Sequence, residues 1–279
     1  MAEFDKAKYK AIEREAYSRK ARSYEKFGSA IFENLASPLL EMSQIRPGEK
    51  VLDVACGVGI PSLAAAKLIA PGGSLVGVDL APGMVDLARI RAQRLGLSNV
   101  SFQEADAEQL PFPNESFDAV LCHQGLAHFT DRTNALSEMR RVLKPEGRVA
   151  LSVWSTPDRT VVIGMVARTI ADLWPAAIVP GAPTWFDFGA SGAIETIMRE
   201  VDFREIHSTR VDHPLEVPDG EEYWQTNLGI SGRLEMLLNS VPNEISQKIA
   251  SKVKSEAEKW REGTILRIPC EEIICRAIK

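Results

Sequence analysis

The sequence predicts an α/β fold in which a mostly parallel sheet is covered by helices on both faces. Apolar strands alternate with helical segments from residue 50 to residue 154, which is the pattern of repeated strand–helix–strand units. The strands are almost continuously apolar, as expected when both faces of a sheet are buried. The chain has 279 residues, of which 45% are hydrophobic and 25% charged, so it is long enough to bury a large core.

The predicted elements follow one another in a regular order. Residues 1–45 are expected to be helical, with the clearest apolar stripe at 27–42. A turn then leads into the alternating region 46–154. Within it we expect strands at 50–55, 74–79, 100–104, 117–122 and 148–154, and helices at 60–69, 82–95 and 134–143.

The pattern changes after Trp154, where prolines and tryptophans become frequent. Residues 155–279 are expected to complete the sheet and to carry helical insertions at about 155–188 and 219–262. The remaining elements expected here are a helix at 191–201, a strand at 204–212 and a final strand at 263–278. Pro269 lies inside that final strand and favours an edge position or a bulge.

Composition argues against several classes of function. The net charge of -5 gives no general support for a nucleic-acid partner, which usually needs a basic face. The four cysteines show no C-x-x-C spacing, so we expect reduced thiols and no metal site. The most apolar helical stretch, 161–180, is interrupted by Arg168 and Asp172, so no membrane span is expected. The N-terminus has no apolar signal region, and a cytoplasmic protein is expected.

A glycine-rich turn, Cys56-Gly57-Val58-Gly59, follows the first strand and allows three interpretations. A phosphate-binding P-loop is rejected because the required Gly-Lys-Ser/Thr ending is absent. A dinucleotide fingerprint is weakened because Ser62 replaces its third glycine. Asp53 favours the third interpretation, since its carboxylate would repel a pyrophosphate and attract an ammonium group. S-adenosylmethionine (SAM) carries an α-ammonium and a sulfonium, and glycines would let the backbone approach it closely.

Acidic residues also end the next two strands. Asp79 lies 20 residues after Gly59, at a position where a carboxylate can accept both hydroxyls of a ribose. Asp106, followed by Ala107, can accept the amino group of an adenine, while Leu80 or Met84 packs on the ring. Each acid has a structural alternative as a helix cap or a solvated loop residue. Because parallel strands end at one edge of a sheet, together these residues predict a single nucleoside-binding crevice.

Four blocks carry a resemblance to a known family. They are VLDVACGVG, GVDLAPGMVDLAR, FQEADAEQLPFPNESFDAVLC and EMRRVLKPEGRVALSVW. In this order they resemble the class I SAM-dependent methyltransferases, most of all the small-molecule group that includes the ubiquinone/menaquinone-biosynthesis C-methyltransferases. The resemblance covers residues 50–154 and departs from the family pattern at Ala55 and Glu146, where many members have glycine. It implies SAM as cofactor and a Rossmann-like seven-stranded sheet with a reversed final hairpin.

The resemblance also implies roles for individual residues. The glycine turn is expected to contact SAM through Ala55, Cys56, Gly57 and Gly59, with Cys122 at the end of the fourth strand. The N-terminal segment 1–45 is expected to cover the cofactor, with Tyr24 against SAM and Tyr17 toward the substrate; packing between helices is the alternative for both tyrosines.

His128 occupies a position where members of this group often carry a histidine, so it is expected to contact substrate or cofactor or to act as a general base. His123 is its rival, although it is also a candidate to face the sheet. Trp185 and Phe186 are candidates for an apolar acceptor pocket, with simple core packing as the alternative. His207 and His213, on the later strand, are expected to be structural.

The function expected from these observations is methyl transfer from SAM to a small, partly apolar metabolite, on oxygen, nitrogen or carbon. The alternative is a SAM-binding enzyme that does not methylate, such as a cyclase or pericyclase on the same scaffold. A nicotinamide-dependent dehydrogenase is a third, less favoured interpretation. The expected partners are a small-molecule substrate and, for the assembly, a second copy of the chain in a homodimer.

Overall fold

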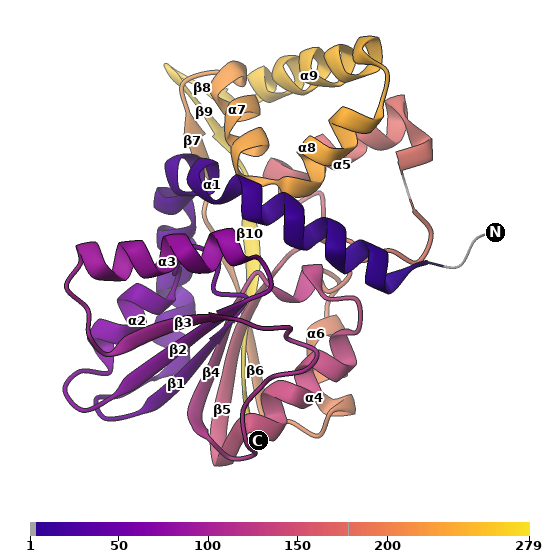
Figure 1. The fold of residues 1–279 in the computed structure, drawn as a ribbon. Coiled ribbons are helices and arrows are strands. Elements are labelled where there is room, and N and C mark those ends of the chain that lie inside the picture. Colours follow the sequence, from indigo (N-terminus) through magenta and orange to yellow (C-terminus); the bar gives the residue numbers. More distant parts are fainter. Residues whose placement is uncertain (1–3, 178) are drawn as a thin grey trace.

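A seven-stranded sheet forms the centre of the molecule. The computed structural model describes residues 4–177 and 179–279, and its sheet has the strand order β3-β2-β1-β4-β5-β10-β6 (Figure 1). The first five strands are parallel, while β10 runs antiparallel to both β5 and β6. The predicted fold and its reversed final hairpin are therefore confirmed. The strands are β1 (Lys50–Val54), β2 (Ser74–Asp79), β3 (Val100–Glu104), β4 (Phe117–His123), β5 (Leu143–Trp154), β6 (Arg204–Asp212) and β10 (Glu271–Ile278).

Helices cover both faces of this sheet, as the apolar strands predicted. Side chains of α4 (Arg132–Val142) and α6 (Ala193–Glu200) form one core with the β4, β5 and β10 residues that point to their face. On the other face, α2 (Ser62–Leu68) packs with the far end of the N-terminal helix. The helix α3 (Pro82–Arg94) packs on β3. The inner strands β1, β4, β5 and β10 therefore bury side chains in both directions, whereas the edge strands β3 and β6 are largely exposed.

A helical cap lies beyond the carboxyl ends of the parallel strands (Figure 1). It is built mainly from the two segments that the sequence predicted as insertions. Its helices are α5 (Val161–Leu173), α7 (Gly220–Ile230), α8 (Gly232–Ser240) and α9 (Asn243–Ala257), with the short 3-10 turns η2 (Pro175–Ala177) and η3 (Glu258–Trp260). The 3-10 turn η1 (Leu126–His128) directly follows β4. Among the described residues, none of the helices combines the length and apolar character needed to cross a bilayer.

The prediction of one long final strand is wrong. The segment 263–278 is divided between two sheets: β9 (Ile265–Ile268) pairs with β7 (Leu215–Val217) and β8 (Arg261–Glu262), whereas β10 belongs to the main sheet. Pro269 lies at the division. Because proline has no N–H to donate to a strand ladder, the chain leaves the small sheet there and enters the large one two residues later.

A single long helix, α1 (Lys6–Ser43), links the sheet to the cap. It begins at Asp5, whose side chain accepts the N–H of Lys8. Helical structure was predicted for 1–45, of which residues 1–3 lie outside the described part. The helix packs against α3, α7 and α8 as well as β5 and β10. At the crossing with α3, the Gly83 N–H donates to Ser18 Oγ (2.9 Å), and a Cβ at position 83 would lie 2.2 Å from the Ser18 carbonyl oxygen. Only glycine fits this contact.

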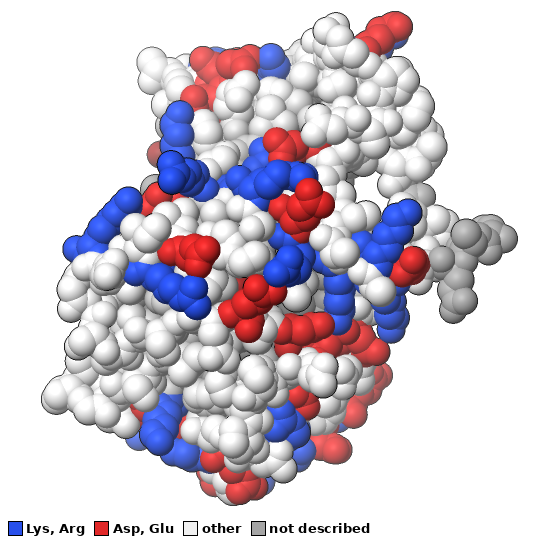
Figure 2. Space-filling view, in the orientation of Figure 1, with Lys and Arg blue, Asp and Glu red and all other residues white. Residues whose placement is uncertain are grey.

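Charges of both signs are interspersed along α1 on the face shown in Figure 2. Several of them pair across element boundaries, such as Arg14 with Glu104 of β3 (2.7 Å) and Arg91 of α3 with Glu33 (2.7 Å). Exposed ion pairs of this kind contribute little to stability, but they are consistent with a fixed register between α1 and the rest of the molecule.

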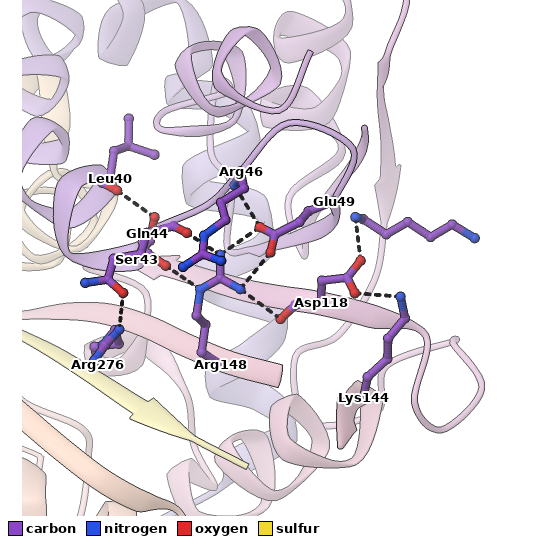
Figure 3. Close-up of polar contacts among 10 residues, drawn as sticks. Leu40, Ser43, Gln44, Arg46, Glu49, Asp118, Lys144, Arg148 and Arg276 are labelled. Carbon is purple, nitrogen blue, oxygen red and sulfur yellow. Dashed lines mark hydrogen bonds and ion pairs between the residues drawn. The ribbon is translucent and has the colours of Figure 1, made fainter. Parts of the chain in front are cut away.

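The C-terminal end of α1 is attached to the sheet by Arg148 of β5, at the end of the strands that lies away from the cap (Figure 3). This guanidinium donates to the carbonyl oxygens of Ser43 (2.5 Å) and Gln44 (2.6 Å) and to both carboxylate oxygens of Glu49 (3.0 and 2.7 Å). The last carbonyls of a helix have no partner within the helix, and its C-terminal end attracts cations. Arg148 supplies hydrogen-bond donors for these carbonyls and a positive charge at the helix end, and so fixes the direction in which α1 leaves the sheet.

We expect Arg148→Met to lower the free energy of unfolding by about 2 kcal/mol, because Glu49 and two helix-end carbonyls lose charged partners. The matched control is Arg204→Met, which removes an exposed ion pair with Glu146 and should change stability by less than about 0.5 kcal/mol. Urea unfolding of both variants measures the difference. Equal effects would show that Arg148 does not anchor α1.

Candidate active site

A cavity of about 810 Å³ lies between the strand ends, α1 and the cap. Its floor is formed by the ends of β1, β2 and β4 and the loops that follow them, where parallel strands commonly present ligand-binding groups. Residues of α1 form one wall and residues of the cap another. Predicted site residues that line it are Tyr17, Tyr24, Ala55, Gly57, Asp79, Leu80, Met84, Asp106, Ala107, His123, His128 and Trp185.

Asp79 holds the glycine turn in shape. Its Oδ2 accepts the N–H of Gly57 (2.9 Å) and its Oδ1 accepts the N–H of Ala81 (2.9 Å). Burial raises the pKa of Asp79, and these backbone hydrogen bonds act in the opposite direction. Gly57 has a φ of +52°, and a Cβ there would meet nothing within 4 Å, so its backbone faces open space. The turn therefore offers an exposed backbone beside a carboxylate. A nucleoside could lie against such a backbone, and its two ribose hydroxyls could donate to the carboxylate.

The expected contact between Asp53 and a ligand ammonium is not found. Asp53 is fully buried, does not line the cavity, and accepts a hydrogen bond from Ser62 Oγ. Burial raises the pKa of this carboxyl group to about 7, although the hydrogen bonds from Ser62 oppose the shift. Asp53 thus joins the strand to the first turn of α2 from behind the glycine loop and is not placed to meet a ligand ammonium.

This geometry predicts a pH effect on stability. Because the pKa of Asp53 is higher in the folded protein than its ordinary value near 3.8, neutral Asp53 stabilises the fold. This stabilisation is fully present below about pH 3.8 and is lost as the pH rises through about 7. We therefore expect the wild type to lose up to about 4 kcal/mol relative to Asp53→Asn between about pH 4 and pH 8. Unfolding of both proteins across this range tests it, and a constant difference would contradict the raised pKa.

Four further predicted residues lie away from the cavity wall. Cys56 packs with Leu63 in the core behind the turn, and Gly59 serves the turn itself, with a φ of +91° and no room for a Cβ beside Leu63. Cys122 is buried in the core under α4, where burial raises the pKa of its thiol to about 12. Phe186 packs at the edge of the cap core. A motif gives the positions of residues in the chain but not the direction of each side chain, and the predicted contacts of these four residues with SAM or the acceptor stay predictions.

The end of the cavity near β3 is more highly charged than the sequence suggested. Lys10 of α1 forms ion pairs with Asp106 (2.7 Å) and Glu108 (2.6 Å), and all three line the cavity. Asp106 also accepts the N–H of Glu108. The predicted acceptor of an adenine amino group is thus already paired with a lysine. Sequence reasoning missed Lys10 because it is one of many charged residues on a long helix.

His128 belongs to a network that crosses from the sheet to the cap. Its Nδ1 lies 2.8 Å from Oε2 of Glu13, and its ring packs edge-on against Tyr17, with the centroids 5.2 Å apart. Glu13 is buried and also accepts from Nε of Arg233 (2.9 Å). Burial opposes ionisation of Glu13, but the charge of Arg233 and the hydrogen bond with His128 hold its pKa below the ordinary value. An ionised Glu13 can orient His128 toward the cavity and assist proton transfer.

His123 lies deeper, at the end of β4. Burial lowers its pKa to about 3, with the neighbouring His213 as a second cause, so the imidazole stays neutral at ordinary pH. Its ring packs edge-on against Phe32, and Tyr24 stacks on the same phenylalanine, with centroids 5.1 Å apart. His213, which was expected to be structural, also lines the cavity. The structure therefore brings both candidate histidines of the β4 end to the cavity and adds a third.

The cap side of the cavity is mainly apolar. Side chains of α5 and α8 line it, namely Val162, Ile163, Val166 and Leu234, and Trp185 contributes an aromatic face. Arg233 lies over that ring, with its Cζ 5.4 Å from the centroid. A pocket with apolar walls and few polar groups is typical of a binding site for a small organic molecule.

Comparisons with known proteins agree with this geometry. A family model described as a methyltransferase domain matches residues 52–151. Nocamycin O-methyltransferase of Saccharothrix syringae is 32% identical over 215 residues, which cover 74% of this chain and 77% of that protein. The ubiquinone/menaquinone biosynthesis C-methyltransferase UbiE of Teredinibacter turnerae is 38% identical over 123 residues, covering 44% of this chain and 49% of that protein. The chain thus matches about half the length of this C-methyltransferase.

Solved structures share the fold. The 4+2 cyclase SpnF matches with a TM-score of 0.54 and 21% identity, covering 88% of this chain and 80% of that one. At this identity the likeness shows the architecture alone.

Proposed function

This chain belongs to the class I SAM-dependent methyltransferases, and from that premise we propose that it methylates a small, partly apolar metabolite bound under the cap. The cofactor is SAM, which supplies an electrophilic methyl group on a sulfonium. The observation that carries the proposal is the shape of the cavity, in which a nucleoside-binding edge made by Gly57 and Asp79 continues into an apolar space beneath α5 and α8.

Within this proposal the residues have distinct roles. Asp79 accepts hydrogen bonds from ribose hydroxyls while it holds the glycine turn, and Leu80 and Met84 pack on the adenine. The backbone at Ala55 and Gly57 lies against the remainder of the cofactor. His128, oriented by Glu13, contacts the acceptor and receives a proton where the acceptor must lose one. The walls contributed by α1 and the cap exclude water and hold the acceptor in line, which is the main requirement for methyl transfer.

The three segments of the chain have distinct roles in this proposal. We propose that residues 1–45 cover the cofactor, that 46–154 bind it, and that 155–279 complete the sheet and enclose the acceptor. Residues 1–3 and 178 of these segments lie outside the described part. A homodimer and a cytoplasmic location stay predictions, for light scattering and cell fractionation respectively. The mixture of acidic and basic groups along α1 (Figure 2) favours a small molecule over a nucleic acid.

The cyclase alternative has support from fold likeness alone, whereas methyl transfer also has the match to an O-methyltransferase over most of both chains. Incubation with methyl-labelled SAM and fractions of hydroxylated and amino metabolites distinguishes the two. We expect label in a small product together with stoichiometric demethylated cofactor, and neither product with Asp79→Ala. Bound SAM that is never demethylated with any fraction would contradict methyl transfer.

A further inference from the structure

A cluster of buried polar side chains lies beside the acceptor half of the cavity. It comprises the buried residues His123 and Gln124 at the end of β4 and Glu272 at the start of β10, together with the partly exposed His213 after β6, and we call it the β10 polar cluster. Because β10 runs antiparallel to its neighbours, its first residues lie at the edge where the parallel strands end. Glu272 is paired in register with Trp154 at the end of β5 and with Val211 near the end of β6.

The β10 polar cluster is incompletely hydrogen-bonded. Glu272 Oε2 accepts from Gln124 Nε2 (2.8 Å), but Glu272 Oε1, Gln124 Oε1, His123 Nε2 and His213 Nε2 are buried atoms without a hydrogen-bond partner among the residues that the structure describes. His213 Nε2 lies 3.8 Å from Oε1 of Glu272, and His123 Nε2 lies 3.9 Å from Oε2, both too far for a hydrogen bond. Buried polar atoms are normally satisfied, so four such atoms in one place indicate a missing partner.

The preceding residue shows that this chain can satisfy a buried carboxylate completely. Glu271 is 3% exposed, and its side chain accepts hydrogen bonds from Ser155, Arg210 and Arg159. Glu272 is 0% exposed, and among the described residues it forms no ion pair with a lysine or arginine. The two neighbours point to opposite sides of the strand. Glu272 does not line the cavity itself but lies behind His123, Gln124 and His213, which do.

The atoms left over define the chemistry of the missing partner. Neutral histidine nitrogens can donate or accept, the amide oxygen of Gln124 accepts, and the carboxyl group of Glu272 can do either according to its protonation. A hydroxyl group has one donor and two acceptor positions and so matches a mixed set of this kind. An anionic group would face a carboxyl group with no cation beside it. An ammonium offers donors alone, so it would match the cluster only with both histidine nitrogens as acceptors, whereas a hydroxyl matches either histidine tautomer.

We propose that the β10 polar cluster binds a hydroxyl group of the acceptor, which makes the substrate class a partly apolar alcohol or phenol. This inference rests on the proposed function, because it assigns the polar end of the same acceptor pocket. The hydroxyl donates to Oε1 of Gln124, whose amide group is held from behind by Glu272, and accepts from one of the two histidines, while the rest of the acceptor lies against the apolar walls of α5 and α8.

Binding of simple probes tests this without knowledge of the natural acceptor. The probes are 2-naphthol, its methyl ether 2-methoxynaphthalene, which has the same ring but no donor, and 1-naphthylmethylamine as the cation. They are titrated by calorimetry into the full chain saturated with S-adenosylhomocysteine (SAH). We expect 2-naphthol to bind about 10-fold or more tighter than either of the others, which corresponds to one hydrogen bond to a charged or strongly polar group.

Two variants locate the preference and one serves as the control. Glu272→Leu and His213→Phe should each reduce the preference for 2-naphthol to less than about 3-fold, whereas Glu271→Gln should retain it. A variant is compared with the wild type only when it binds SAH with the same affinity. If Glu272→Leu does not fold, the result with His213→Phe decides. Equal binding of the probes by the wild type, no binding of 2-naphthol, tighter binding of the amine, or an unchanged preference in both variants would overturn the inference. Failure of SAH itself to bind would instead contradict the proposed function.

Discussion

Replacing Asp79 with alanine is expected to weaken the affinity for SAH by about 100-fold or more. We propose that the carboxylate accepts the ribose hydroxyls, and a hydrogen bond to a charged group contributes about 1.5–3 kcal/mol. The same carboxylate also accepts the N–H groups of Gly57 and Ala81, so its removal loosens the turn against which the cofactor lies. Both losses act on the same ligand, which makes this the largest binding effect that the structure predicts.

Calorimetry of the folded variant measures this effect. The matched control is Asp86→Ala, which removes an exposed carboxylate from α3, in the helix that follows the same strand. Its affinity for SAH should equal that of the wild type. An affinity of Asp79→Ala within about threefold of the wild type would remove Asp79 from the cofactor site.

Replacing Arg233 with methionine is expected to lower the free energy of unfolding by about 3 kcal/mol. The side chain connects α8 to α1 through Glu13, donates to the carbonyl oxygen of Ala127, and lies over the rings of Tyr9 and Trp185. Without it, Glu13 is a buried carboxylate with His128 as its remaining partner, and an unpaired buried charge is strongly destabilising. The α1 wall of the cavity would lose its attachment to the cap at the same time.

A double-mutant cycle separates the ion pair from packing. In Glu13→Leu with Arg233→Met the buried charge is gone, so we expect the double variant to be more stable than Arg233→Met alone by about 1–2 kcal/mol. Urea denaturation of the four proteins gives the coupling energy. Additive effects of the two single changes would show that Glu13 and Arg233 do not depend on each other.

Much of the fold followed from local pattern. The strands at 74–79, 100–104 and 204–212 have the predicted bounds, because each is a short apolar or alternating run between clear turns. The division of the final segment at Pro269 was missed. Apolar and β-forming residues continue on both sides of that proline, and nothing local shows that the two halves join different sheets.

The site was only partly predictable. The position of Asp79 at the cavity could be predicted because an acidic residue at the carboxyl end of a parallel strand lies where the strand ends meet. The position of Gly57 could be predicted because the turn requires a residue with a positive φ. Asp53 was placed wrongly, since strand position alone does not tell whether a side chain meets the cavity or, as here, Ser62. Glu13 and Arg233 are separated by 220 residues, and Glu272 lies in an apolar run. Such residues meet only through tertiary folding, so no local pattern could reveal them.

We propose above all that the cavity between the strand ends and α1 binds an adenosyl amino acid. Calorimetric titration of the wild-type chain with SAH, and separately with NADH, tests it most directly. The account predicts saturable one-site binding of SAH with a dissociation constant on the order of micromolar and no heat from NADH. Binding of NADH with no binding of SAH would contradict it.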